Sequence, residues 1–228
     1  MQPGPALALF ALLVALAAGP AGAQGFKFSQ PDTSAIADEE ARKDRIAQQL
    51  STPCRADLKG KKIMVIIGER QSNGMIAAQQ QNYGPHFQAI NDRLRSLGLA
   101  TYTPEEIRKQ IAQAEIDAYF RNDPDAALSA AKRLGASFVL RGLISSHATM
   151  NPVMPVNQVS VSMGFTLSGA NGRMISDVEA SSSSYSGADV SRMALTLVNE
   201  QADEVVARLY ADYCRNAGLA SGGKPAPK

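Results

Sequence analysis

The residues that could support catalysis or metal binding are few and widely spaced. The chain of 228 residues contains two histidines, His86 and His147. A metal site, or a Ser-His pair that joins His147 to Ser145 or Ser146, is one hypothesis, because imidazole is a common metal ligand and general base. However, neither histidine has a partner at ligand spacing, and the motif G-x-S-x-G is absent from the sequence. We therefore expect no metal and no catalytic residue, with both histidines at a helix start or in a loop.

Gly68 ends an apolar run and Gly74 follows it, which raises the hypothesis of a phosphate-binding loop. The sequence contains neither the Gly-Lys-Ser/Thr of a P-loop nor G-x-G-x-x-G, so we expect no nucleotide cofactor. Glu69 and Arg70 lie where open α/β sheets often bind ligands, and we expect them to form an ordinary surface ion pair. A small-molecule-binding periplasmic module that uses residues 68–74 is the alternative to the function favoured below.

Two further polar clusters have structural explanations. Thr103 and Glu106 have the spacing of a capping box at the start of a helix, and the charges of Glu105 and Glu106 favour its N-terminus. The run of serines at 181–184 is of low complexity and predicts an edge strand or loop rather than a nucleophile. Because so few residues could support catalysis, the sequence favours a binding or assembly role over an enzymatic one.

The amino-terminal residues predict export from the cell. Residues 1–23 carry no charged side chain, contain an apolar run at 6–18 and end in an A-x-A cleavage site. The run is shorter than the ~20 residues that a membrane-spanning helix needs. We expect residues 1–23 to be a cleaved signal peptide. The mature chain, from Gln24, is then expected to be a soluble periplasmic or secreted protein without an integral membrane anchor.

Cys54 and Cys214 are the two cysteines of the chain. In an exported protein an even count favours a disulfide, and two buried free thiols are the alternative. Because C-x-x-C is absent, redox catalysis is not expected. The net charge of +2, from 23 basic and 21 acidic residues, argues against dedicated nucleic-acid binding.

The hydrophobic pattern divides the mature chain into three parts. Residues 24–53 form an N-terminal helical segment with few large apolar side chains, 54–217 form a single α/β domain, and 218–228 form a flexible tail rich in Gly and Pro. The two cysteines lie at the two ends of the domain. A disulfide between them would join its beginning to its end.

Within the domain, the periodicity predicts the order β-α-α-α-β-β-β-α. Buried strands are expected at 61–68 and 137–144, a strand of period two at 158–168, and a returning strand at 173–180 after the Asn171-Gly172 turn. Helices are expected to begin at Pro85, at Thr103 (continuing to Ala114) and at Asp123. The last helix spans 188–213, with Asp189 or Ser191 as its cap.

A long helical connection makes the first two strands parallel, while the hairpin adds antiparallel strands. We therefore expect a two-layer α/β domain with a mixed sheet of about four strands, helices on one or both faces, and a long C-terminal helix. The strand at 158–168 presents large apolar residues to the core. Its other face is small and polar and is expected to lie against water or to accept a partner; it comprises Ser160, Ser162, Gly164, Thr166 and Ser168.

Several segments carry a resemblance to a known family. They are the strand KKIMVII, the helices FQAINDRLRSLGL and TPEEIRKQI, the passage AAKRLGASFVLRGLISS with Gly135 and Gly142, and the hairpin VSVSMGFTLSGANGRMI. Their order resembles bacterial envelope domains with an anticodon-binding-domain-like fold. Members of that family include the periplasmic domain of the curli secretion lipoprotein, the activator lipoprotein of penicillin-binding proteins, the amino-terminal domain of the Tol-Pal propeller protein and the middle domain of the flagellar H-ring T protein.

The resemblance implies a non-catalytic periplasmic accessory or assembly protein of the cell envelope. Such a protein would bind an envelope partner in secretion, flagellar or cell-wall machinery, and homo-oligomerisation stays open. No binding residues carry over, because the matching motifs mark the fold and not a site.

Overall fold

Four long strands and two short ones form one mixed sheet in the computed structural model, which describes residues 33–70, 76–78, 84–120, 124–154, 156–187 and 189–220. The long strands are β1 (Lys62–Arg70), β4 (Phe138–Met150), β5 (Asn157–Gly169) and β6 (Met174–Ser186). β1 pairs in parallel with β4, and the β4–β5 and β5–β6 pairs are antiparallel. The predicted mixed α/β fold is therefore confirmed.

Two short strands were not predicted. β2 (Ile76–Ala78) extends the sheet in the order β2-β1-β4-β5-β6, and β3 (Ala100–Thr101) pairs with the start of β1. Strands of two or three residues are too short to display a hydrophobic period, so their pairing with β1 is a consequence of the tertiary fold.

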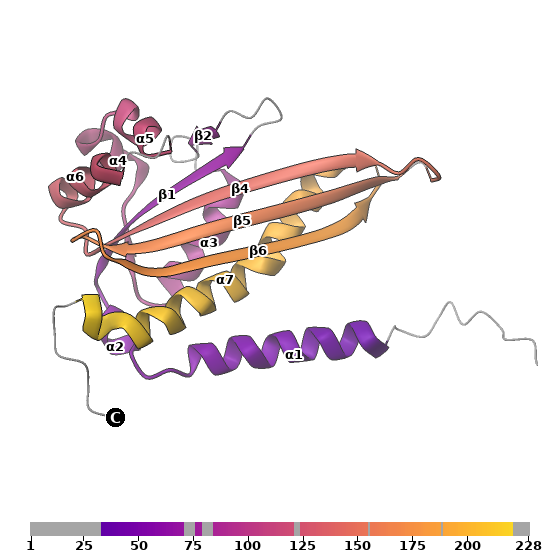
Figure 1. The fold of residues 1–228 in the computed structure, drawn as a ribbon, viewed down its shortest axis with the longest axis horizontal. Coiled ribbons are helices and arrows are strands. Elements are labelled where there is room, and N and C mark those ends of the chain that lie inside the picture. The colour runs from indigo at the N-terminus through magenta and orange to yellow at the C-terminus, as the bar shows by residue number, and fades with distance from the viewer. Residues whose placement is uncertain are drawn as a thin grey trace, which may run out of the picture.

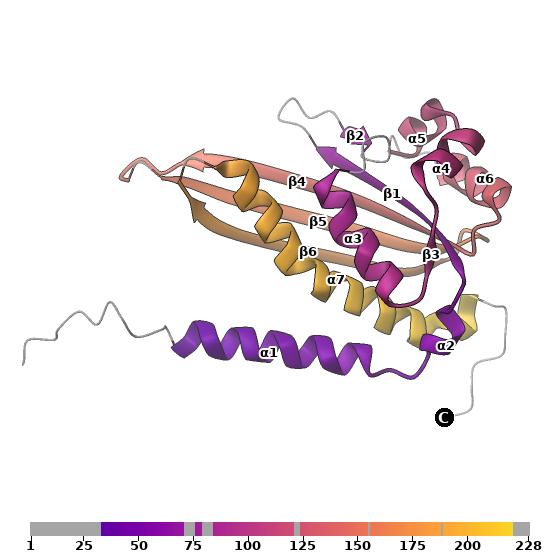
Figure 2. The same ribbon diagram turned by 180° about the vertical axis from the view of Figure 1, so that it is seen from behind.

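Helices cover both faces of the sheet around β1 (Figures 1 and 2). One face holds α3 (Pro85–Ser96) and the long α7 (Val190–Ala220). The other face holds α4 (Pro104–Gln110), α5 (Gln113–Phe120) and α6 (Pro124–Leu134). α1 (Thr33–Leu50) lies along α7, and α2 (Arg55–Leu58) is a single turn before β1.

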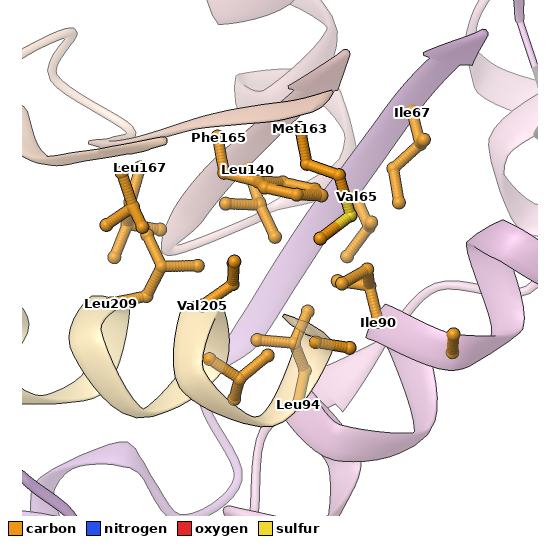
Figure 3. Close-up of a cluster of buried hydrophobic side chains, with 14 of the residues drawn as sticks. Val65, Ile67, Ile90, Leu94, Leu140, Met163, Phe165, Leu167, Val205 and Leu209 are labelled. Atoms are coloured by element: carbon orange, nitrogen blue, oxygen red, sulfur yellow. The ribbon is translucent and has the colours of Figure 1, made fainter. Parts of the chain in front are cut away.

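The continuous apolar run of β1 is explained by this double cover. Val65 and Ile67 face α3 and α7, in a core that also contains Phe165 and Val205 (Figure 3). Met64 and Ile66 belong to a separate cluster under α4–α6. Because successive side chains of a strand point to opposite faces, a strand buried on both faces must be apolar at every position.

The capping box predicted at the start of α4 is present. The Thr103 hydroxyl accepts a hydrogen bond from the Glu106 backbone N–H at 3.2 Å, and the Glu106 carboxylate accepts one from the Thr103 N–H at 2.8 Å. The hydrogen bond from the Thr103 backbone is the main reason why the pKa of Glu106 lies below its usual value. The cap fixes the segment that connects β3 to α4.

The prediction of one helix from Thr103 to Ala114 was wrong. α4 ends at Gln110, Ile111 is extended (φ −128°, ψ 122°), and α5 begins at Gln113. A second helix starts because the Glu115 carboxylate accepts a hydrogen bond from the Ala112 N–H at 3.0 Å. Arg133 of α6 donates to the same carboxylate at 2.7 Å and is the main cause of its lowered pKa.

Three elements are longer than the local pattern indicated. β4 continues to Met150 and β6 to Ser186, because their exposed halves pair with β5 along its whole length. The serine run at 181–184 is therefore part of an edge strand, which was one of the two structures predicted for it. α7 begins with Asp189 as its cap, which accepts a hydrogen bond from the Arg192 N–H at 2.9 Å. The helix runs to Ala220, past the predicted end at 213 and into the expected tail.

The predicted disulfide between Cys54 and Cys214 is present, with its Cα atoms 5.6 Å apart. It joins the segment before β1 to the last third of α7. Tyr210 supports the same junction, because its hydroxyl accepts a hydrogen bond from the Cys54 N–H at 3.4 Å and donates to the Thr52 carbonyl. Lys61 donates to the Tyr213 hydroxyl at 3.1 Å. The beginning and end of the domain are thus held together by covalent and polar contacts.

The amino-terminal part of the chain is described only from Thr33. The predicted signal peptide at 1–23 lies outside the described residues. α1 has few apolar side chains, as expected, and Arg42 holds it on α7 by donating to the Glu200 carbonyl. Among the described residues, no helix combines the length and hydropathy needed to cross a bilayer.

Candidate interaction surface

In the part of the chain that the structure describes, no helix covers one face of the distal half of the sheet. α4–α6 lie over Met64, Ile66 and Val139, whereas β4, β5 and β6 extend away from these helices with this face open (Figure 1). Cross-strand register places small polar residues in rows on it. We call this surface the serine face and define it by Ser145, His147, Ser160, Ser162, Ser181 and Ser183.

The serine face is shallow because its side chains are small. Two adjoining hollows of about 490 and 560 Å³ lie on it, and both are lined by Ser145, Ser162 and Ser181. Arg70 and Glu179 border the first hollow, so a positive and a negative side chain lie at its rim. A flat surface of this kind is suited to a broad partner and not to enclosing a small ligand.

The turn between β4 and β5 carries a group of exposed apolar side chains. Met150, Val153 and Met154 are 68%, 88% and 52% exposed, and we call them the apolar tip. Tyr185 is 55% exposed and lies close to the tip in the sheet. It pairs with Gln158 of β5, which in turn pairs with Thr149, the residue before Met150. Four of the seven large apolar side chains that are exposed in the described residues therefore gather at this end of the sheet.

The backbone of the apolar tip is held by Asn151. Its side-chain oxygen accepts hydrogen bonds from the N–H groups of Val153 at 2.9 Å and Met154 at 3.1 Å, and its own N–H donates to the Val156 carbonyl at 2.9 Å. An Asx turn of this kind orders the loop without burying its side chains. The turn projects beyond the end of β6 (Figure 1).

The outer edge of β6 is blocked over its first half. Asn216 of α7 donates to the Ile175 carbonyl at 2.8 Å, and Arg208 donates to the Glu179 carbonyl at 3.0 Å. Since alternate residues of an antiparallel strand direct their backbone groups to the same side, Ser183 and Tyr185 face this edge as Glu179 does. Among the described residues β6 is the edge strand of the sheet, and no strand pairs with its second half there.

The predicted ion pair between Glu69 and Arg70 was wrong. As neighbours in β1 they point to opposite faces of the sheet. Glu69 contacts the imidazole Nδ1 of His86, at the first turn of α3, and Arg70 borders the serine face. Because 61–68 was predicted to be a strand, the alternation of side chains between its two faces could have predicted that Glu69 and Arg70 point apart. Gly74, which was considered for a phosphate-binding loop and rejected on sequence grounds, lies outside the described residues.

His147 lies inside β4 and not in the loop predicted for it. It is exposed, and its cross-strand neighbour is Ser160. Within the described part of the chain no hydrogen bond joins its ring to Ser145 or Ser146, so a Ser-His pair there gains no support. Three or more His, Cys, Asp or Glu side chains in a metal-binding arrangement do not occur in the described ranges.

The apolar tip was not predicted from the sequence. The signal that could have found it is the density of large apolar residues (MNPVM) in a turn between two strands. Turns are normally polar because they are solvated, so such a run indicates a contact surface.

No protein-family model matches the sequence, and no curated protein matches it. Several solved structures are similar to the chain at low identity, with TM-scores below 0.5. The PelC dodecamer from Paraburkholderia phytofirmans is 17% identical, with a TM-score of 0.39 over 67% of this chain and 88% of that chain. The C-terminal domain of LpoB from Salmonella enterica is 16% identical, with a TM-score of 0.40 over 61% and 93%.

Lipoprotein GNA1162 from Neisseria meningitidis is 14% identical to the chain, with a TM-score of 0.40 over 64% of this chain and 97% of that chain. One of these three structures is named as a lipoprotein, but similarity at this level assigns neither a family nor a function.

Proposed function

We propose that this protein is a non-catalytic accessory or assembly protein of the bacterial cell envelope, which acts by binding another protein through the apolar tip and the adjoining serine face. The observation that carries the proposal is the gathering of exposed apolar side chains at Met150, Val153, Met154 and Tyr185. Contiguous exposed apolar surface costs solvation free energy, and in soluble proteins it marks an interaction site.

The chemistry of the surface fits a protein partner. Methionine and tyrosine are enriched at protein interfaces, where Met adapts to irregular pockets and Tyr combines an apolar ring with a hydroxyl. The serine face offers hydroxyl groups without long side chains that would have to be ordered on binding. The open half of the β6 edge can accept an extended segment of the partner through backbone hydrogen bonds.

The envelope location rests on the sequence. The signal-peptide pattern at 1–23 supports export, and the Cys54–Cys214 disulfide is consistent with an oxidising compartment. The identity of the captured partner will show whether the protein serves secretion, flagellar or cell-wall machinery.

Replacing the apolar tip should abolish this binding. In the triple variant Met150→Ser/Val153→Ser/Met154→Ser we expect affinity for the partner to fall on the order of 100-fold, because three apolar side chains no longer leave water. The partner is captured from an envelope fraction on the immobilised, disulfide-intact wild-type protein, and its affinity for each variant is measured with purified components.

Met174→Ser is the matched control. Met174 is 68% exposed, like Met150, but lies at the opposite end of the three-stranded ribbon. We expect this variant to bind as the wild type does. Equal binding by the triple variant would contradict the proposal. So would tip-dependent binding to protein-free phospholipid vesicles without a protein partner, since the tip would then be a membrane contact.

A further inference from the structure

The oxidisable sulfur of this protein lies in its methionines, because both cysteines are already cross-linked. Cys54 and Cys214 form the disulfide, and the chain contains no free thiol. A methionine thioether is oxidised to the sulfoxide without any change of the backbone, provided that the oxidant reaches the sulfur. The exposure of each methionine therefore decides where the folded protein can be modified.

The methionines of the described ranges differ sharply in exposure. Three are shielded by the hydrophobic cores on the two faces of the sheet, namely Met64 at 0%, Met163 at 2% and Met193, which is partly buried. Three are open to solvent, namely Met150 at 68%, Met154 at 52% and Met174 at 68%. An oxidant in solution reaches the second group directly, whereas it reaches the first only when the core opens.

Two of the three exposed thioethers belong to the apolar tip. Met150 and Met154 supply two of its three side chains, and Val153 supplies the third. The hydrogen bonds of the Asn151 side chain hold the turn that carries them. A sulfoxide places a polar S–O group on a side chain that was apolar, and this change disrupts contact surfaces rich in methionine. The apolar character of the tip thus depends on the oxidation state of two sulfur atoms.

We propose that Met150 and Met154 are modification sites, at which a peroxide converts the apolar tip into a polar one and so prevents it from binding the envelope partner. This proposal rests on the proposed function, because it concerns the affinity of the same tip for the same partner. The modification acts on the free protein, since a bound partner covers both sulfur atoms.

The reaction is a two-electron transfer of oxygen. A lone pair of the thioether sulfur attacks one oxygen of the peroxide, so that an S–O bond forms while the O–O bond breaks. With hydrogen peroxide, the proton of the attacked oxygen passes to the departing one, which leaves as water. The sulfur is oxidised by two electrons and the peroxide is reduced by two. A methionine sulfoxide reductase, which takes two electrons from thiols, restores the thioether.

Peptide mass spectrometry of the disulfide-intact mature protein after treatment with hydrogen peroxide locates the modification. We expect Met150, Met154 and the equally open Met174 to gain one oxygen at least about tenfold faster than Met64 and Met163, which react only through opening of the core. The unfolding midpoint of the product should equal that of the untreated protein. Equal rates at the tip and at the two buried positions would overturn the proposal.

Affinity for the captured partner, measured before and after peroxide, tests the consequence. Oxidation of the wild type should lower it at least about tenfold, because two side chains of the tip become polar, and sulfoxide reductase should restore it. Met150→Leu/Met154→Leu has no sulfur in the tip, so peroxide should leave its affinity at that variant's own starting value. Met174→Leu is the matched control and should lose affinity on oxidation as the wild type does.

The outcomes separate this proposal from the proposed function. If the untreated protein binds its partner through the tip and the oxidised protein binds equally well, the modification site is refuted and the binding function stands. A similar loss in oxidised Met150→Leu/Met154→Leu would also refute it, since the effect would come from elsewhere. If the untreated protein shows no binding that depends on the tip, the proposed function itself fails, and the modification site with it. Repair by the reductase needs no variant, so it decides the case even if the double variant does not fold.

Discussion

Removal of the Cys54–Cys214 disulfide is expected to lower the free energy of unfolding by about 3 to 5 kcal/mol. The bond closes a loop across a sequence separation of 160, which includes the whole sheet. In the chain-entropy account, a cross-link of this length strongly restricts the unfolded chain and therefore raises its free energy. A loss of this size corresponds to a fall in Tm of about 10 °C for a domain of this size.

Urea unfolding of the oxidised protein, the reduced protein and the Cys54→Ala/Cys214→Ala variant measures this effect. The reduced protein and the variant should unfold at the same, lower midpoint, because both lack only the cross-link. The polar contacts of Tyr210 and Lys61 at the same junction are retained in both. If reduction left the midpoint unchanged, or if mass spectrometry found two free thiols in the mature protein, the assignment of a stabilising disulfide would be wrong.

The second large effect is expected at Gly142, where β4 passes under the ring of Phe165. A methyl group added at Gly142 would lie 2.7 Å from Cδ1 of Phe165 and 3.1 Å from Cγ1 of Ile67. Both neighbours are buried in the core between the sheet, α3 and α7 and have little room to move. Gly142→Ala is therefore expected to cost about 1 to 3 kcal/mol of stability through overpacking.

A double-mutant cycle separates this cause from others. Phe165→Ala alone should cost about 3 to 5 kcal/mol, since it leaves a cavity. Gly142→Ala combined with Phe165→Ala should cost less than the sum of the two single changes, because removal of the ring makes room for the new methyl group. Gly164→Ala is the control, since a methyl group there meets nothing within 4 Å. Additive costs in the cycle would show that the Gly142–Phe165 contact is not the source.

Much of this fold could be predicted because its long elements have clear periods. β5 alternates along its whole length, so its apolar face and its small polar face were both identified. β1 is apolar throughout because helices cover both of its faces. The start of α4 was visible in the Thr103 capping box, and the disulfide followed from the compartment and the cysteine count.

The features that were missed depend on contacts distant in sequence. The break at Ile111 requires Arg133 of α6 to hold Glu115, and nothing local indicates that pair. In the outer half of β4, the side chains on both faces are largely exposed, so the sequence there shows no alternation of apolar and polar residues. Only its pairing with β5 shows that this half is a strand.

The central claim is that the apolar tip contacts another protein in the envelope, and site-specific photo-crosslinking in the cells that produce the protein tests it most directly. A photoreactive residue is placed at Val153 in one variant and, in the second, at Met174, which is also well exposed (68%) and lies at the other end of strands β4–β6. The account predicts one discrete protein adduct from position 153 and none from position 174. No protein adduct from position 153, or the same adducts from both positions, would contradict it.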